Sequence, residues 1–543
     1  MRRGGHLTRA LAFAFVVLVA AAVGACSSSS ATQASTSTDP GTSTQSNTSP
    51  DPKTKAVRSH DQRPNIVLIQ TDDQALTQFS KRYMPNVTKL LAARGTVFSH
   101  AYMTTPDCCP SRAALITGQY GHNNGVLRNA YSLLKHKSNV LPVWLRRAGY
   151  VTAHIGKFLN PYHHLEPAPG WTQWHTLLKP GRYYNYDLSV NGREVHRGDK
   201  PQDYVTRVFT RTAVRMIHRY VPRRRPLYLQ VDEVAPHVSR GGHTETPECN
   251  PLPDPRDRGK FSHTPLPRPP SFDEPDMKDK PVFMRGIPPL SQDNIDHMTR
   301  NFRCGLAALR SVDRGVGRIY DAIKRSGELR RTVFIFCTDN GVFYGQHRLA
   351  LGKLNPYQEA VSTPLVMRVP DRYVGGRTVA RVSTAVANID YAPTILRLAH
   401  GKPCQGQRCR IMDGRPLQPL IGGKRPGWAK NRPVGMEIAL KHGSAQHLAA
   451  CEYTGVHVGN RTFVKYRRVQ KPGTNKCVRS RDFEEYNLAS DPFQLRNLCF
   501  GGDPHSCPNR PSTPRLRKDV KRIRHCAGIA GRDPRTAGRP YCG

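Results

Sequence analysis

Uninterrupted apolar runs recur along the chain and predict strands that are buried on both faces. The first run covers 65–70 and lies between Pro64 and a pair of acidic residues. Further runs follow at 150–155, 227–234, 332–337 and 364–369. Continuous apolar runs of this length are typical of parallel sheets whose two faces are both covered by helices.

Helical periodicity lies between these runs. Apolar residues recur in steps of three and four from Ile295 to Ile323, and Gly327 then offers a C-cap. A shorter helix is predicted over 85–94, ended by Gly95. Because strands alternate with helices, we expect an α/β fold with a large, mostly parallel sheet flanked by helices.

The pattern changes in the C-terminal half of the chain. Residues 243–292 are rich in proline and predict an irregular surface excursion over one end of the sheet. Over 430–500, short alternating runs such as 462–466 predict a smaller subdomain with an antiparallel sheet. The segment 501–543 is rich in Arg, Pro and Cys, and we expect an irregular tail pinned by disulfides.

The N-terminus has the pattern of an export signal. Three arginines precede an apolar run over 10–25, which is too short for a comfortable membrane span. The run closes on Val-Gly-Ala-Cys, which resembles a bacterial lipoprotein box and predicts a signal peptide over 1–25 with Cys26 as the lipidated residue. An ordinary signal peptide with a cysteine near its cleavage site is the alternative. Ser and Thr make up 15 of the 24 residues over 27–50, which predicts a disordered tether over 26–62 to the outer face of a membrane.

Composition adds two constraints. Fourteen cysteines in an exported chain favour disulfides. With Cys26, the vicinal pair at 108–109 and the strand residue Cys337 set aside, neighbouring cysteines suggest five pairs as a hypothesis: Cys249–Cys304, Cys404–Cys409, Cys451–Cys477, Cys499–Cys507 and Cys526–Cys542. The formal charge of +42 favours anionic substrates or surfaces, although an arginine-rich solvated surface explains it equally. No helix-turn-helix, zinc-finger or RNA-binding pattern is present, so we expect no specific nucleic-acid partner.

One motif carries the chemistry: Cys108-Cys109-Pro110-Ser111-Arg112, followed by Thr-Gly at 117–118. It resembles the type I sulfatases, whose Cys-x-Pro-Ser-Arg core is the site at which a separate generating enzyme oxidises cysteine to formylglycine. The resemblance implies an alkaline-phosphatase-like fold, with the catalytic domain over 63–429 and Cys108 as the modified residue. A vicinal pair of structural cysteines is the alternative.

The implied modification and the residues of the motif together predict where the nucleophile lies in the fold. A hydrated aldehyde offers two geminal hydroxyls, of which one attacks sulfur and the other later expels sulfate, so that one difficult step becomes two easier ones. Pro110 suits a first helical turn, and helix N-termini favour anions. We therefore expect the nucleophile to lie at the start of a helix.

Acidic and amide side chains follow two of the predicted strands and form a candidate metal site. Asp72 and Asp73 follow the first strand directly, and Asp339 and Asn340 follow the strand at 332–337. Strand ends in a parallel sheet face the crevice where ligands bind, and an all-oxygen set suits a hard cation. The resemblance implies Ca²⁺, with Mg²⁺ as the alternative and the modified Cys108 as a further ligand. Each pair alone could instead form a helix cap or turn.

The remaining implied site residues are basic. Arg112, Lys157 and Lys353 match family positions that grip sulfate oxygens, and His237, with Lys353, matches positions that protonate the leaving oxygen. One position departs from many arylsulfatases, which carry a histidine where this chain has Leu159. The group that assists sulfate elimination is therefore open, with His347 as a candidate by position.

The stretch Gly-Lys-Phe-Leu-Asn at 156–160 resembles the N-acetylglucosamine-6-sulfatases and the extracellular heparan sulfate endosulfatases, as does the stretch from 170 to 192. The expected function is removal of sulfate from sulfated sugars such as 6-O-sulfated N-acetylglucosamine. Two alternatives are a phosphodiester or phosphonate hydrolase on the same fold, and a basic lipoprotein that binds polyanions without catalysis.

The lipid anchor has a direct test. The wild-type protein should enter the detergent phase on partitioning, whereas Cys26→Ser should stay in the aqueous phase, because the variant lacks the sulfur that carries the lipid. Both proteins should be exported. Aqueous behaviour of both would refute the anchor.

Overall fold

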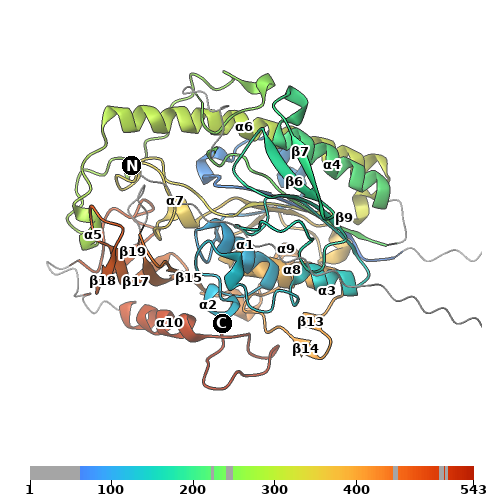
Figure 1. Cartoon of the computed structure of the whole chain (residues 1–543). Coiled ribbons are helices and arrows are strands. Elements are labelled where there is room, and N and C mark those ends of the chain that lie inside the picture. The colour runs from blue at the N-terminus through green and yellow to red at the C-terminus, as the bar shows by residue number, and fades with distance from the viewer. Residues whose placement is uncertain (1–60, 222–224, 240–248, 444–449, 501–506, 508–511) are drawn as a thin grey trace, which may run out of the picture. The chain divides into compact units, whose positions relative to one another are not determined.

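The computed structural model describes residues 61–221, 225–239, 249–443, 450–500, 507 and 512–543 (Figure 1). The predicted signal peptide, Cys26 and nearly all of the predicted tether lie outside the described residues. Within the described ranges, no helix is both long enough and apolar enough to cross a bilayer.

A ten-stranded mixed sheet runs through the molecule in the order β11-β2-β10-β9-β1-β8-β4-β5-β6-β7. At its centre, β1 (Asn65–Thr71) is parallel to both β9 (Thr332–Thr338) and β8 (Leu227–Asp232). The parallel set continues through β4 (Val151–Gly156) and β5 (Gln173–Leu177). These five strands confirm the predicted parallel core.

Antiparallel pairs flank this core. One side adds β6 (Tyr186–Val190) and β7 (Arg193–Arg197), and the other adds β10 (Leu365–Arg368), which is antiparallel to β9. The short strands β2 (Thr96–Phe98) and β11 (Arg381–Val382) complete that edge. The run predicted at 364–369 is therefore a strand as expected, but it makes this edge of the sheet mixed.

Burial on both faces explains the apolar runs. Ile66 and Leu68 of β1 enter one hydrophobic core, whereas Val67 and Ile69 enter the core on the opposite face. Successive side chains of a strand point to opposite faces, so a strand between two helical layers is apolar at every position.

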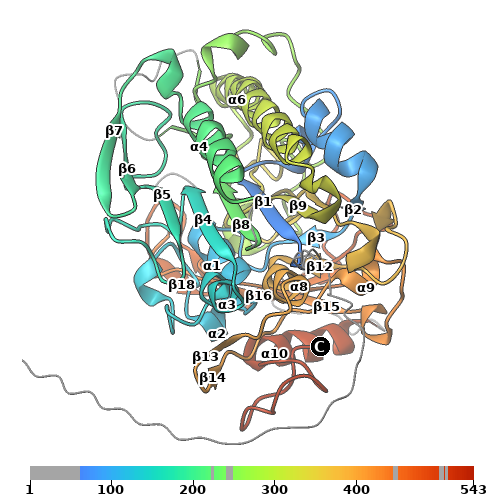
Figure 2. The ribbon, with the colours of Figure 1, turned by 90° about the vertical axis from the view of Figure 1, so that its right-hand side faces the viewer.

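Different helices supply the two layers (Figure 2). On one face lie α4 (Val205–Tyr220) and the long α6 (Gln292–Arg325). On the other lie α1 (Cys108–Thr117), α3 (Leu141–Arg147) and α8 (Tyr391–Leu398). The predicted helix around Ile295–Ile323 is confirmed as α6, and Gly327 follows it with a φ of 77°.

The helix predicted over 85–94 is confirmed in its extent, and the structure shows that most of it is not a regular α-helix. The chain forms a π-helical turn, Val87–Leu91, followed by a 3₁₀ turn, Ala92–Arg94. Asp313 of α6 accepts hydrogen bonds from the Val87 N–H at 2.9 Å and from the Asn86 side chain at 2.8 Å. These two contacts hold the start of the π-helical segment. The local sequence pattern gives no sign of them, because Asp313 is far away in the sequence.

The predicted C-terminal sheet is present and antiparallel throughout. It consists of β15 (Pro433–Ala439), β16 (Glu452–Val458), β17 (Arg461–Gln470), β18 (Cys477–Arg479) and β19 (Phe483–Asn487). Its core includes residues near the start of the chain's α/β part, such as Tyr102 and Ala114. The two parts therefore share buried apolar surface.

The expectation of an irregular tail over 501–543 needs correction, because α10 (Thr513–His525) lies within it. Leu516, Val520 and Ile523 are buried in the core of the C-terminal sheet. Their spacing of four and three residues is a helical signal that the dense basic residues around it obscured.

All five predicted disulfides are confirmed. In the described part of the chain, Cys108, Cys109 and Cys337 are the free cysteines, and all three are buried. Cys337 lies within β9, as expected from its apolar run.

Candidate active site

The parallel pairing of β1 with β9 brings the acidic strand ends together. Thr71 and Thr338 are partners in the register, so Asp72 and Asp339 are the next residues of adjacent strands. The Asp73 backbone has a φ of 60°, and its N–H donates to Asp339 Oδ1 at 3.1 Å. Two segments 266 residues apart thus deliver three carboxylates to one place.

Cys108 is the first residue of α1 and is 2% exposed. The N-cap Asp107 accepts a hydrogen bond from the Cys108 N–H at 3.0 Å. Asn129 supports this turn, because it donates to Asp107 at 2.7 Å and accepts from the Cys109 N–H at 2.8 Å. The expected position at a helix N-terminus is confirmed.

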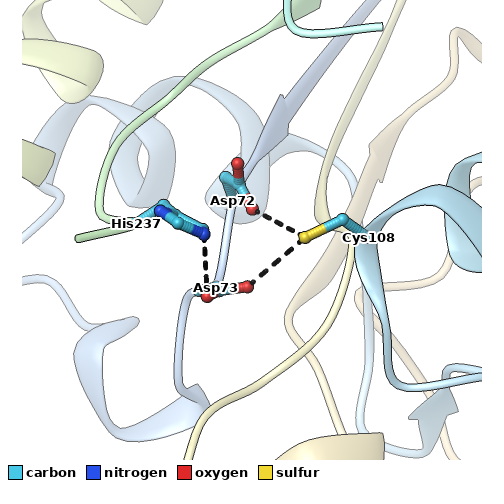
Figure 3. A group of neighbouring side chains, drawn as sticks. All are labelled: Asp72, Asp73, Cys108 and His237. Carbon is cyan, nitrogen blue, oxygen red and sulfur yellow. Dashed lines mark hydrogen bonds and ion pairs between the residues drawn. The ribbon is translucent and has the colours of Figure 1, made fainter. Parts of the chain in front are cut away.

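Figure 3 shows the Cys108 sulfur facing the two aspartates that follow β1. Its Sγ lies 3.4 Å from Asp72 Oδ1 and 3.9 Å from Asp73 Oδ1. Together with His237, these residues have ligand atoms within 4.8 Å of one another.

Two lysines reach the same sulfur. Lys157 follows β4, pairs with Asp72 and lies 3.3 Å from Cys108 Sγ. Lys353 pairs with Asp73 and lies 2.9 Å from Cys108 Sγ. The Lys157 side chain is 4% exposed and the Lys353 side chain 12% exposed, so solvent screens their attraction to the aspartates only weakly.

Arg112 lies one turn after Cys108 on α1 and is 1% exposed. Its Nε donates to Asp339 Oδ2 at 2.9 Å, and its Nη1 donates to the Lys157 carbonyl at 2.6 Å. Arg112 therefore links the helix to two strand ends and fixes the position of Cys108 relative to the acidic cluster.

His237 approaches from the segment after β8. Its Nε2 faces Asp73 Oδ2 at 3.7 Å (Figure 3). Its Nδ1 lies 2.5 Å from the Val238 carbonyl. The carbonyl contact assigns the proton of the neutral ring to Nδ1 and leaves Nε2 facing the cluster. With Asn340, which donates to Asp73, all predicted site residues except Cys26, which lies outside the described part, are connected in one largely buried network.

The charges in this network shift the pKa values strongly. Burial alone would raise the pKa of Asp72, but Lys157, His237 and Arg112 hold it well below its usual range. Burial and the Asp72 charge raise the pKa of Asp339 to about 6. Burial, followed by the Asp72 charge, raises the pKa of the Cys108 thiol well above its usual value. The unmodified thiol is therefore protonated and a weak nucleophile.

The residues present fit a hard divalent cation. Asp72, Asp73, Asp339 and Asn340 offer only oxygen ligands, which Ca²⁺ and Mg²⁺ prefer. The Asn340 side-chain oxygen is buried and has no hydrogen-bond partner among the described residues, while its nitrogen donates to Asp73 at 2.7 Å. A buried, unpaired amide oxygen beside three carboxylates is the donor that such a cation would complete.

Sequence reasoning missed a third acidic strand end. Asp232 closes β8, accepts from His154 at 3.0 Å and lies 3.8 Å from Arg112. His154 in turn contacts Thr176 at 2.6 Å. The rule that identified Asp72 applies equally to Asp232 and could have found it. Asp107, directly before the expected helix start, also matches the N-cap preference, whereas Asn129 left no signal in the sequence.

The position of Leu159 and the contacts of His347 bear on the open elimination step. Leu159 is 1% exposed and packs in the core. His347 is buried, lies 2.7 Å from Glu274 and stacks on Tyr357 with ring centroids 4.1 Å apart. These contacts hold the His347 ring between Glu274 and Tyr357, and its role stays a prediction.

The sulfatase family profile matches residues 64–401. The chain belongs to the sulfatase family. It is 32% identical over 384 residues to an extracellular sulfatase SULF-1 homolog of Drosophila melanogaster, covering 69% of this chain and 33% of that relative. It is 28% identical over 512 residues to N-acetylglucosamine-6-sulfatase of Capra hircus, covering 88% and 87%. This sulfatase-family chain thus spans a third of the Drosophila protein and most of the goat protein.

Solved structures support the same fold. One similar structure holds its substrate D-glucosamine-2-N,6-O-disulfate, with a TM-score of 0.66, 21% identity, and coverage of 84% of this chain and 97% of that one. The phosphonate monoester hydrolase of Agrobacterium radiobacter gives a TM-score of 0.60, 19% identity, and coverage of 84% and 94%. At these identities the likeness establishes the fold of the sulfatase-family chain and leaves its substrate to be proposed.

Loss of the N-cap of α1 should affect both the stability of the protein and its turnover, whereas loss of another N-cap should affect stability alone. Asp107→Ala should lower the free energy of unfolding by about 1 kcal/mol, as for other lost N-caps. It should also slow turnover of an aryl sulfate, because the first turn of α1 carries Cys108. Ser291→Ala removes the N-cap of α6 and serves as the matched control, with similar destabilisation and an unchanged rate. Equal rates in the two variants, measured beside thermal unfolding, would contradict the positioning role of Asp107.

Proposed function

We propose that this chain is a sulfuric ester hydrolase that removes sulfate from sulfated sugars such as 6-O-sulfated N-acetylglucosamine. The observation that carries the proposal is the convergence on Cys108 of two ammonium groups and the acidic cluster. A buried site of this composition suits a nucleophile that attacks an anionic ester, because the cations offset the charge of the substrate.

The nucleophile is formylglycine made from Cys108 by a separate generating enzyme. The raised pKa of the Cys108 thiol supports this assignment, since the unmodified side chain would be mostly protonated at neutral pH. A hydrated aldehyde supplies one hydroxyl for attack on sulfur and a second that later returns to the aldehyde as sulfate leaves.

Asp72, Asp73, Asp339 and Asn340 would hold a divalent cation, with Ca²⁺ as the proposed ion and Mg²⁺ as the alternative. When bound, the cation supplies positive charge that favours the ionised form of a neighbouring hydroxyl. The modified Cys108 would lie beside it, since its sulfur already contacts Asp72 and Asp73.

We assign two roles to the basic residues: neutralising the charge of the sulfuryl group and protonating the leaving oxygen. Arg112, Lys157 and Lys353 would neutralise the oxygens of the transferring sulfuryl group. Burial lowers the pKa of His237 to about 4, whereas the pKa of Lys353 is raised well above its usual value by Asp73 and Cys108 despite its burial. Lys353 therefore carries a proton at neutral pH, and we assign protonation of the leaving oxygen to the His237–Lys353 pair.

Relatives support the substrate class and an exported location. The goat relative is named an N-acetylglucosamine-6-sulfatase, and the Drosophila relative an extracellular sulfatase. We propose that this protein likewise acts outside the cytoplasm, held to a membrane through lipidated Cys26. The boundaries at 63–429, 430–500 and 501–543 remain our proposed division of the folded part.

Phosphonate or phosphodiester hydrolysis is a second candidate, favoured by the fold likeness to the Agrobacterium hydrolase. Binding of polyanions without catalysis is a third, favoured by the charge of +42. A binding protein has no need for a buried cysteine at the centre of a charged cluster, so we rank it below both hydrolases.

Matched esters separate the two hydrolases. The ratio kcat/KM should be at least about 100-fold higher for 4-nitrophenyl sulfate than for the diester bis(4-nitrophenyl) phosphate and the monoester 4-nitrophenyl phenylphosphonate. 6-O-sulfated N-acetylglucosamine should be desulfated as well, with sulfate release measured by ion chromatography. A preference for either phosphorus ester would replace the proposed function with the second candidate.

Asp73→Asn tests the cation. The variant should lose bound metal and at least about 100-fold in kcat, because it removes one charged ligand while the fold is retained. Asp199→Asn, at an exposed acidic residue, is the matched control and should keep both properties. Elemental analysis of the purified proteins, together with chelation, measures the outcome. Full turnover by a sample shown to be free of metal would contradict the proposal.

A further inference from the structure

A polar cavity of 410 Å³ lies near the end of α1 that is opposite to Cys108. The β13–β14 hairpin (Cys404–Gln405 and Arg408–Cys409) and the segment after α10 contribute to its lining. Its basic residues are Arg408, Arg410, Arg539 and His136. Among the described residues that line it, none is acidic.

Arg410 is buried in the wall of this cavity, with 6% of its surface exposed. It donates to the Asn139 carbonyl at 2.6 Å, to the carbonyls of Lys135 and His136 at 2.7 and 2.9 Å, and to the Gln119 side-chain oxygen. All these acceptors are uncharged. Burial lowers the pKa of Arg410 to about 10 against the opposing effect of the Asp413 carboxylate, so the guanidinium stays charged at neutral pH although none of its hydrogen-bond acceptors is a carboxylate. An oxyanion in the cavity would offset this buried charge.

Arg539 connects the cavity to α10. It donates to the His525 carbonyl at 2.9 Å and to the Cys526 carbonyl at 2.8 Å, and it also binds the Asn123 side chain. His525 and Cys526 are the end of α10 and its C-cap. The basic wall of the cavity therefore continues directly into the helix.

The helix itself is strongly basic. The sequence of α10 contains six Lys or Arg residues and one acidic residue, Asp519. The pKa of Lys465 of β17 is lowered, first by burial and then by like charges that include Arg517 and Arg524 of α10. Arg467 of β17 and Arg524 share one carboxylate, Glu452, at 4.0 Å each. Cations crowded in this way favour an anionic partner.

We propose that α10, β17 and the cavity form an extended binding surface for a sulfated polysaccharide, with one oxyanion of the chain seated beside Arg410. Both views place α10 and the β13–β14 hairpin on the lower side of the described part (Figures 1 and 2). We name this surface the α10 face. It binds a polymer independently of Cys108 and of the hydrolysis proposed above.

The chemistry of the surface favours a glycan over a nucleic acid. Gln119, Ser138 and Gln405 line the cavity and suit sugar hydroxyl groups. Single-stranded nucleic acids need exposed aromatic rings on which bases stack. Phe483, the ring between the basic side chains of this face, has Lys465 at 5.5 Å and Arg517 at 5.0 Å from its centroid. Two cations thus already contact the Phe483 ring.

Affinity measurements in a Cys108→Ala background test the proposal, because hydrolysis cannot consume the probe. The probe is a fluorescent, 6-O-sulfated glucosamine–uronate octasaccharide, with Kd measured by anisotropy at several salt concentrations. Arg408→Gln with Arg524→Gln removes one charge from the cavity and one from α10. Arg193→Gln with Lys200→Gln removes two exposed charges near β7 and is the matched control.

The first pair should raise Kd about tenfold and reduce its salt dependence, whereas the control pair should change Kd less than about twofold. With Cys108 restored, turnover of 4-nitrophenyl sulfate should be the same for both pairs, which separates this surface from the active site. Equal loss of affinity in the two pairs, or no loss in either, would overturn the proposal. Equal or tighter binding of the desulfated octasaccharide, or of single-stranded DNA of matched charge, would overturn the assignment to a sulfated glycan.

Discussion

The parallel pairing of β1 with β9 is the constraint on which the site depends. It places Asp72 and Asp339 on adjacent strand ends, where three buried carboxylates lie within reach of one another. Such a cluster is unfavourable unless cations accompany it, because burial and mutual repulsion both oppose ionisation. Arg112, Lys157 and Lys353 come from three other segments to meet it.

This requirement ties the surrounding fold to the chemistry. Lys157 reaches the cluster because β4 pairs in parallel with β8, and Arg112 does so because α1 is capped beside the same strand ends. Removal of any one cation would take from a carboxylate of the cluster its nearest positive charge, which is more costly than the pair itself is favourable. The same arrangement holds Cys108 between the two lysines, so stability and nucleophile position share their interactions.

Much of this could be predicted from the sequence, and the rest depended on tertiary contacts. The strand at 65–70 and the long helix around Ile295–Ile323 were predictable because burial on both faces and helical periodicity each leave a direct pattern. The motif at 108–112 identified the nucleophile, and the strand-end rule identified Asp72 and Asp339. The helix at 85–94 was also predicted, but its π-helical form after Asn86 was not, since that segment is anchored to Asp313 on a distant helix. The link from Asn129 to the cap of α1 likewise joins residues whose proximity only the fold creates.

The most direct test of the account is the chemical state of residue 108 in active protein from a host that contains a generating enzyme. Mass spectrometry of the peptide spanning 108–112 should find an aldehyde at Cys108 and an intact thiol at Cys109, with the aldehyde fraction proportional to the specific activity of each preparation. A fully active preparation whose Cys108 is an unmodified thiol would contradict the central claim.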